Sequence, residues 1–253
     1  MNNIFEEKVK MARKVFCIQD FPGDLFTHIT KSEEYIDRFK LIIFKEDLHK
    51  LHGFIAYEGD YTYVGINHKR PIYVQNLTLG HELGHRFLHE GMFYSDDKKS
   101  VEIGASKNTE ESEAFEFGRE LLYPKSLFHE DDEYINKNSL LNPSQAKRLG
   151  LFINELCHKY YLSFETVLRW HLYKNYKVNL YYQYIDSIND ALGTKYTNLD
   201  TNFYIAKDST YDKPSDAPYI HLHHLVKEAI EKNIISKATG EAILFPYFNQ
   251  EGE

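Results

Sequence analysis

Residues 78–89 read TLGHELGHRFLH, and this stretch decides which fold and which chemistry the chain is expected to have. Leu79 and Leu83 are four positions apart, as on the buried face of a helix. Residues at this spacing lie on one side of a helix, so His81 and His85 can both direct an imidazole nitrogen at one ion. The stretch therefore predicts a helix that supplies two ligands to one metal ion.

Glu82 follows the first of these histidines, which completes a His-Glu-x-x-His pattern typical of zinc peptidases. From this position its carboxylate can reach a water at the ion without acting as a ligand. The pattern predicts one Zn²⁺ per chain and Glu82 as the catalytic base.

A catalytic zinc site needs a third protein ligand, and a carboxylate-rich helix expected over 109–123 offers several. Glu113 shares a face with Phe117 and Leu121, so we expect it to lie on the buried side and to be the third ligand. Periodicity alone leaves a surface position for Glu113 open. The carboxylates expected to face water or to complement the helix N-terminus are Glu110, Glu111 and Glu116.

His89 is also close in sequence, but it lies about 12 Å along the helix axis from His81. It cannot share an ion on which His81 and His85 already converge. We expect His89 to pack beside the site or to contact a ligand.

The segments around this helix predict an α+β fold. Residues 4–50 show helical spacing, and residues 53–67 (GFIAYEGDYTYVGIN) read as a hairpin with a turn at Glu58-Gly59-Asp60. Residues 72–76 (IYVQN) indicate a third strand. We therefore expect a mainly helical protein with a small antiparallel sheet packed beside the HExxH helix. The strand YTYVGIN could offer an edge to an extended substrate, or serve structural pairing alone.

The second half of the chain is expected to be a helical C-terminal region. After a connection over 125–142, residues 144–174 read as helix, turn, helix, and a further amphipathic helix is expected at 220–232. We expect two domains, a metallopeptidase domain at 1–135 and a partner- or substrate-binding region at 136–253.

Composition narrows the function classes. The 253 residues carry a formal net charge of −8, which makes direct nucleic-acid binding an unfavoured alternative. The two cysteines, Cys17 and Cys157, form no CxxC pair that would hold a structural zinc. No apolar leader and no run of about 20 uncharged residues occurs, so we expect a cytoplasmic protein without a membrane partner.

Residues 53–89 and 111–124 (ESEAFEFGRELLYP) resemble the ImmA/IrrE family of metallo-endopeptidases of bacteria and mobile elements. The similarity covers the hairpin, the TLxHELGHxxLH helix and an E-x-E-A helix, in which the Glu before Ala corresponds to Glu113. Phe115 and Gly118 depart from the family pattern, which has Asn and Ala there.

The resemblance implies a zinc-dependent endopeptidase with a protein substrate, such as a transcriptional repressor that binds DNA. The alternative is a non-catalytic, metal-containing anti-repressor that regulates transcription by protein binding alone.

Overall fold

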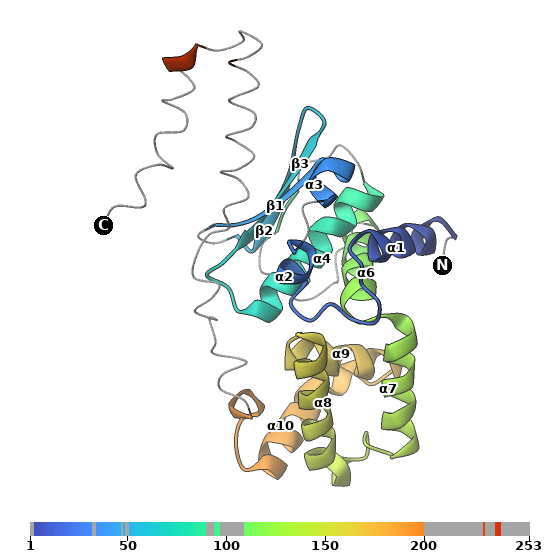
Figure 1. Cartoon of the computed structure of the whole chain (residues 1–253). Coiled ribbons are helices and arrows are strands. Elements are labelled where there is room, and N and C mark those ends of the chain that lie inside the picture. Colours follow the sequence, from blue (N-terminus) through green and yellow to red (C-terminus); the bar gives the residue numbers. More distant parts are fainter. Residues whose placement is uncertain are drawn as a thin grey trace.

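The computed structural model describes residues 3–31, 34–46, 48, 51–89, 94–96, 109–199, 230 and 236–238. Helices pack against a small sheet and continue beyond it, which confirms the predicted α+β class (Figure 1). The helix expected at 220–232 lies, apart from residue 230, outside the described residues. Throughout the described ranges, every helix is too short or too polar to cross a lipid bilayer.

The sheet has the strand order β1-β3-β2-β4. Its strands are β1 (Leu41–Glu46), β2 (Gly53–Glu58), β3 (Tyr61–Asn67) and β4 (Tyr94–Asp96). The predicted hairpin is present, since β2 and β3 pair antiparallel around a turn at Gly59. The prediction of a wholly antiparallel sheet was wrong, because β1 pairs with β3 in parallel.

β1 also corrects the helical reading of residues 4–50. Leu41, Ile42 and Ile43 are fully buried, and β-branched residues favour a strand when a partner strand is available. β3 therefore lies between two strands, and its edges are both hydrogen-bonded. The expectation that YTYVGIN could offer a free edge to a substrate was wrong for this reason.

The HExxH helix, α4 (Ile72–Leu88), is longer than predicted. The strand expected at 72–76 is its first part, and the helix begins directly after Pro71. Two amide side chains explain why residues 72–76 form a helix and not the predicted strand. Gln75 donates to the Arg70 carbonyl at 2.6 Å, and Asn76 accepts from the Leu25 amide at 2.9 Å. These contacts satisfy buried polar side chains in the first turns of α4. The sequence pattern of the same residues had predicted a strand.

α4 packs on the sheet and, on its other side, very closely against α6 (Thr109–Leu122). Gly80 and Gly84 of α4 face Ala114 and Gly118 of α6. A Cβ at Gly84 would lie 2.5 Å from the Ala114 carbonyl oxygen, and a Cβ at Gly118 would lie 2.6 Å from the Gly80 carbonyl carbon. Only residues with little or no side chain allow the two backbones to approach this closely.

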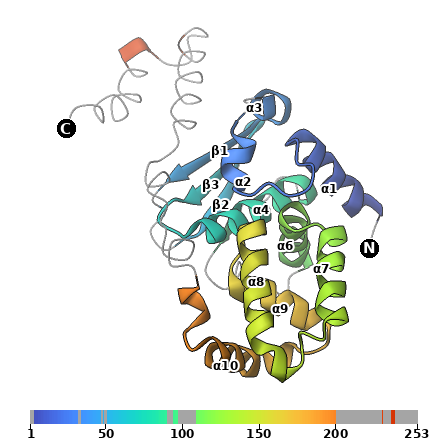
Figure 2. The same ribbon diagram turned by 60° about the horizontal axis from the view of Figure 1, so that its bottom comes forward.

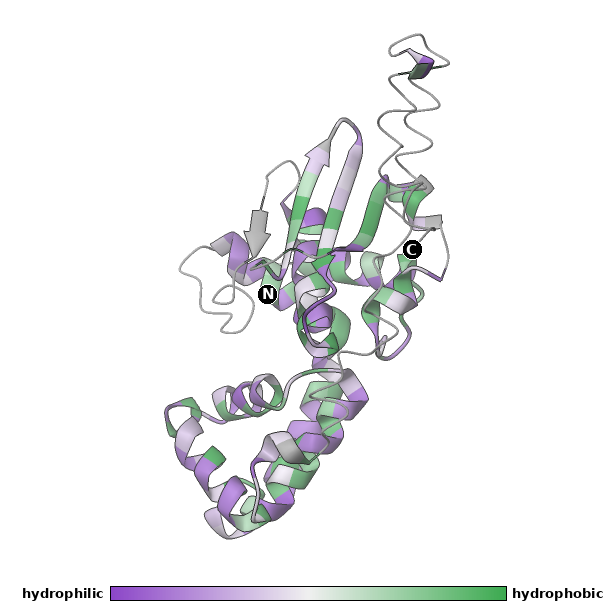
Figure 3. Cartoon of the chain, turned by 90° about the vertical axis from the view of Figure 1, so that its left-hand side faces the viewer, coloured by the Kyte–Doolittle hydropathy of each residue, from purple (hydrophilic) through white to green (hydrophobic). Residues whose placement is uncertain are grey.

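Three helices precede the sheet: α1 (Asn3–Val15), α2 (Leu25–Ile29) and α3 (Glu34–Phe39). After α6 come α7 (Lys125–Lys137), α8 (Ala146–Tyr160), α9 (Phe164–Lys174) and α10 (Tyr181–Leu192). Short 3-10 turns lie at Pro143–Gln145, Val178–Leu180 and Tyr196–Asn198. α7 to α10 form a group beyond the end of α6, away from the sheet (Figures 1 and 2). Hydrophilic and hydrophobic residues mix along these helices (Figure 3).

α7 replaces the connection that was predicted over 125–142. The helix starts after Pro124, and it buries Phe128 and Ile135, seven positions apart, on one face. The predicted domain boundary at 135–136 falls near the C-terminal end of this helix, and the division itself stays a prediction.

Side chains join the two parts of the molecule. The Asn76 amide of α4 donates to the Tyr161 carbonyl at 3.3 Å, at the turn between α8 and α9. Phe21 contacts Tyr160 edge to face, with ring centroids 5.3 Å apart. The core is therefore continuous from the sheet to the C-terminal helices.

Candidate metal centre

α4 brings the two histidines of the motif together. The Nε2 atoms of His81 and His85 lie 3.1 Å apart, and the ring planes are nearly perpendicular at 85°. Both residues are buried, with 1% of His81 and none of His85 exposed. Two ring nitrogens thus point at the same small volume inside the protein.

α6 adds a carboxylate to this volume. Glu111 Oε2 lies 3.2 Å from His81 Nε2, and Glu111 Oε1 lies 3.6 Å from His85 Nε2. One ligand atom from each of the three residues can be chosen so that all lie within 4.8 Å of one another. The close contact of α4 with α6 is what places Glu111 here, because Ala114 and Gly118 follow it at three and seven positions on the same helix face.

The spacing of these atoms suits zinc. Ligand atoms about 2.0–2.1 Å from a tetrahedral Zn²⁺ lie about 3.3–3.4 Å from each other. The Nε2–Nε2 separation of 3.1 Å and the 3.2 Å between His81 Nε2 and Glu111 Oε2 are close to the edges of such a tetrahedron, while His85 Nε2 lies 3.6 Å from the other carboxylate oxygen, Oε1. Two imidazoles and one carboxylate also form a donor set found in catalytic zinc sites, with the fourth position left for water or substrate.

The structure places Glu111, and not the predicted Glu113, beside the two histidines. Glu113 does not reach the two Nε2 atoms; its carboxylate contacts His89 instead, with Oε2 3.0 Å from His89 Nε2, and 52% of its side chain is exposed. Glu111, which was expected to face water, occupies the place assigned to Glu113.

The sequence pattern pointed to Glu113 and not to Glu111 because α6 is buried on two sides. Phe117 and Leu121, which suggested a buried face for Glu113, are indeed fully buried. Phe117, however, packs against Phe87 and Phe5, with ring centroids 5.5 and 6.4 Å apart, and not along the contact with His81. The signal that could have identified Glu111 is the small pair Ala114 and Gly118, which marks the close helix contact.

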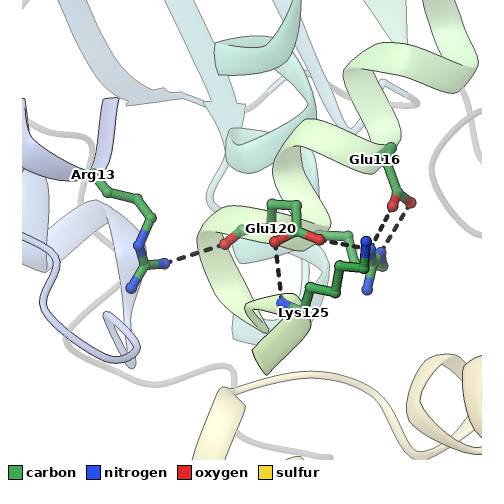
Figure 4. Close-up of polar contacts among 5 residues, drawn as sticks. Arg13, Glu116, Glu120 and Lys125 are labelled. Carbon is green, nitrogen blue, oxygen red and sulfur yellow. Dashed lines mark hydrogen bonds and ion pairs between the residues drawn. The ribbon is translucent and has the colours of Figure 1, made fainter. Parts of the chain in front are cut away.

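Two further carboxylates of α6 are used elsewhere. Glu116 and Glu120 both accept hydrogen bonds from Arg119, and Glu120 also accepts one from the Lys125 backbone amide at 3.0 Å. The Arg13 guanidinium of α1 donates to the Glu120 carbonyl oxygen at 3.1 Å (Figure 4). These contacts stabilise the C-terminal end of α6 and keep both carboxylates away from the histidines.

The electrostatics of Glu111 favour its ionised form. Hydrogen bonds from His81, and next from His85, hold the pKa of the Glu111 carboxyl well below its usual value, although burial acts in the opposite direction. The carboxylate is therefore ionised and carries the negative charge that a divalent cation requires.

Glu82 is completely buried on α4, directly after His81. It is not one of the three residues whose ligand atoms lie together, and its role as the catalytic base stays a prediction.

His89 lies beside His85, at the end of α4. Its Nδ1 lies 3.3 Å from His85 Nδ1, on the side of the His85 ring opposite the Nε2 atom. His89 thus lies beside the site and contacts His85, as expected.

Comparisons of the chain with models of known protein families, with curated proteins and with solved structures return no match.

Proposed function

We propose that this chain is a zinc-dependent endopeptidase of the ImmA/IrrE type, with His81, His85 and Glu111 as zinc ligands and Glu82 as the catalytic base. The observation that carries the proposal is the convergence of two Nε2 atoms and one carboxylate at 3.1–3.6 Å beside a buried glutamate.

Bound Zn²⁺ supplies a Lewis acid that polarises a peptide carbonyl and lowers the pKa of water to about 7. The chain's own contribution to the proton transfers is Glu82. Its carboxylate accepts a proton as the water oxygen attacks the carbonyl carbon, and it returns that proton to the amine nitrogen as the C–N bond breaks. The buried position of Glu82 favours both steps, because bulk water does not compete for the proton there.

The three proposed ligands differ in exposure. The imidazoles are buried, whereas 20% of the Glu111 side chain is exposed. Of the three proposed ligands, Glu111 is the one that meets solvent.

The proposed substrate is a protein, and the family resemblance favours a DNA-binding repressor. A role in binding DNA directly is not part of the proposal. In α9, Arg169 pairs with Glu165 at 2.8 Å, and its guanidinium lies 3.8 Å from the centre of the Tyr181 ring. This cation is thus engaged within the protein.

Replacing Glu82 with Gln tests the proposal, because the amide keeps the size of the side chain but cannot accept the proton. We expect unchanged zinc content and a fall in hydrolysis of at least about a hundredfold. The substrates would be a labelled unfolded protein and a repressor encoded near the gene, with fragments measured by mass spectrometry. The matched control is Glu155→Gln on the exposed surface of α8, which should cleave as the wild type does.

The same variant separates the enzyme from the anti-repressor alternative. If the wild type leaves both substrates intact at stoichiometric concentration, or if Glu82→Gln retains the full biological effect, the peptidase proposal is wrong and the binding role is favoured.

A further inference from the structure

We propose that His89 and Glu113 form a hydrogen-bonded relay that positions the His85 imidazole and strengthens its bond to the metal. The inference rests on the proposed metal centre but not on peptide hydrolysis. In this relay Glu113 does not bind the metal itself but acts on the ligand His85 through His89.

The relay is a continuous line of contacts that leads away from the site. His85 Nε2 faces His81 and Glu111, and His85 Nδ1 lies 3.3 Å from His89 Nδ1. His89 Nε2 in turn lies 3.0 Å from Glu113 Oε2. Exposure increases along this line, from none at His85 to 52% at the Glu113 side chain. The buried ligand is thereby connected to a solvated carboxylate.

The end of α4 makes this contact geometrically feasible. The His89 backbone N–H still donates to the His85 carbonyl at 2.8 Å, but the dihedral angles of His89 (φ −130°, ψ 58°) lie outside the helical region. The His89 ring is thereby held 5.4 Å from the His85 ring, at an interplanar angle of 54°. The helix terminus and the relay thus depend on the same residue.

The number of ring protons determines which atom donates and which accepts in each hydrogen bond of the relay. A neutral imidazole carries a single N–H, and a metal takes the lone pair of the other nitrogen. With His85 Nε2 on the metal, its Nδ1 carries the proton and donates to the lone pair of His89 Nδ1. The His89 proton is then on Nε2, where the Glu113 carboxylate accepts its hydrogen bond. Every donor along the line meets an acceptor only in this arrangement of neutral rings.

A relay of this kind fixes the tautomer and the orientation of the ligand and increases its basicity. Loss of such an outer contact typically lowers metal affinity by about 10–100-fold. His89 and Glu113 are therefore positioning residues, and their effect should be visible in metal binding itself.

The test is zinc affinity, measured on the full chain by competition with a chromophoric chelator. His89→Leu removes the acceptor and should weaken zinc binding by about tenfold or more. In His89→Asn the side-chain oxygen takes the place of Nδ1, and this variant should recover most of the affinity. Rescue by an acceptor of this kind is not expected if His89 only fills space.

Variants of Glu113 give a second test that does not depend on the folding of the His89 variants, because the Glu113 side chain is half exposed. Glu113→Ala should weaken zinc binding, Glu113→Gln should do so less because it keeps an acceptor oxygen, and Glu155→Ala is the charge-matched control. The Co²⁺-substituted protein gives a second readout, since a reoriented His85 changes the visible absorption bands of the metal.

Zinc affinity in Glu113→Ala equal to that in Glu155→Ala would overturn the relay, as would a folded His89→Leu protein that binds zinc like the wild type. A wild type that binds zinc with this dependence but cleaves no protein leaves the relay standing and removes the peptidase. A wild type that binds no zinc overturns both.

Discussion

Two parts of the molecule each bury a histidine beside carboxylates, and they use it in opposite ways. Between α4 and α6, the Nε2 atoms of His81 and His85 converge on one volume together with Glu111. Among the C-terminal helices, His171 has separate partners on its two sides. Its Nδ1 lies 3.2 Å from Asp132, and its Nε2 lies 3.2 Å from the Tyr123 hydroxyl.

The second cluster is closed by further contacts. Tyr123 and Tyr160 both donate to Asp131, at 2.9 and 2.8 Å. Burial, and next the Asp131 carboxylate, raise the pKa of both tyrosines above the usual value, so their hydroxyls stay protonated donors. The His171 ring also stacks on Phe128 with centroids 4.5 Å apart.

The difference shows how a structural histidine can be distinguished from a proposed metal ligand. In the His171 cluster every ring nitrogen has its own hydrogen-bond partner, which leaves no lone pair directed at a common point. In the His81 and His85 pair the two nitrogens face each other, an arrangement that a shared cation stabilises. Burial and a nearby carboxylate are common to both clusters, so neither property identifies a metal site by itself.

The largest expected effect comes from removing one histidine of each kind. His85→Ala should abolish stoichiometric zinc binding, whereas His171→Ala should keep the zinc and lower the free energy of unfolding by about 3 kcal/mol, because it leaves a cavity and unsatisfied partners. Elemental analysis of protein purified without chelator, together with urea denaturation, measures both. Zinc loss in His171→Ala with His85→Ala unaffected would reverse the assignment of the two clusters.

The next effect distinguishes the two neighbouring glutamates of α6. Glu111→Ala should lower zinc affinity by more than about a hundredfold, beyond the range of a residue outside the ligand shell. Glu113→Ala should produce the smaller loss described above. Chelator competition under identical conditions measures the ratio, and a larger loss in Glu113→Ala would restore the prediction made from the sequence.

A smaller effect concerns one glycine from each part. Gly84→Ala would place a Cβ 2.6 Å from the Ala114 Cα, in a contact between two backbones, and should cost about 2 kcal/mol and weaken zinc binding. Gly150→Ala meets the Ile188 Cγ2 at 2.7 Å. The Ile188 side chain can move away, and alanine has a helix propensity about 1 kcal/mol more favourable than that of glycine. The stability of Gly150→Ala should therefore be nearly that of the wild type. Equal destabilisation of the two variants in urea denaturation would show that the contact of α4 with α6 is no tighter than that of α8 with α10.

The smallest effect is the acid sensitivity of the C-terminal helices. Burial opposes ionisation of Asp132, but hydrogen bonds from His171 and Asn175 outweigh it and lower the pKa of the carboxyl. The folded state therefore favours the ionised form, and its contribution to stability is complete above the unfolded pKa of about 3.9 and is lost as pH falls through the lower folded value.

Asp132→Asn should accordingly lose less stability than the wild type when the pH is lowered below about 4. Urea denaturation in the presence of chelator can be followed by the fluorescence of Trp170, the single tryptophan, which contacts Tyr123 in this cluster. Identical pH dependence in the two proteins would contradict an ionised Asp132 as a source of stability.

Much of the fold was predictable because its signals are local. The hairpin of β2 and β3 follows from alternating residues around Glu58-Gly59-Asp60, and α6 from Thr109, its periodic apolar residues and Pro124. The elements that were missed depend on partners distant in sequence. β1 becomes a strand beside β3, and the start of α4 is helical because Asn76 contacts the α2 segment.

By itself, the sequence determined the pair of histidines one helical turn apart and the position of Glu82 between them, because a regular helix converts spacing into direction. Only the tertiary structure decided which carboxylate joins them. α6 is buried on two faces, so hydrophobic periodicity does not distinguish Glu111 from Glu113. The close contact of Gly80 and Gly84 with Gly118 and Ala114 sets the rotation of α6 about its axis and thereby brings Glu111 to the site.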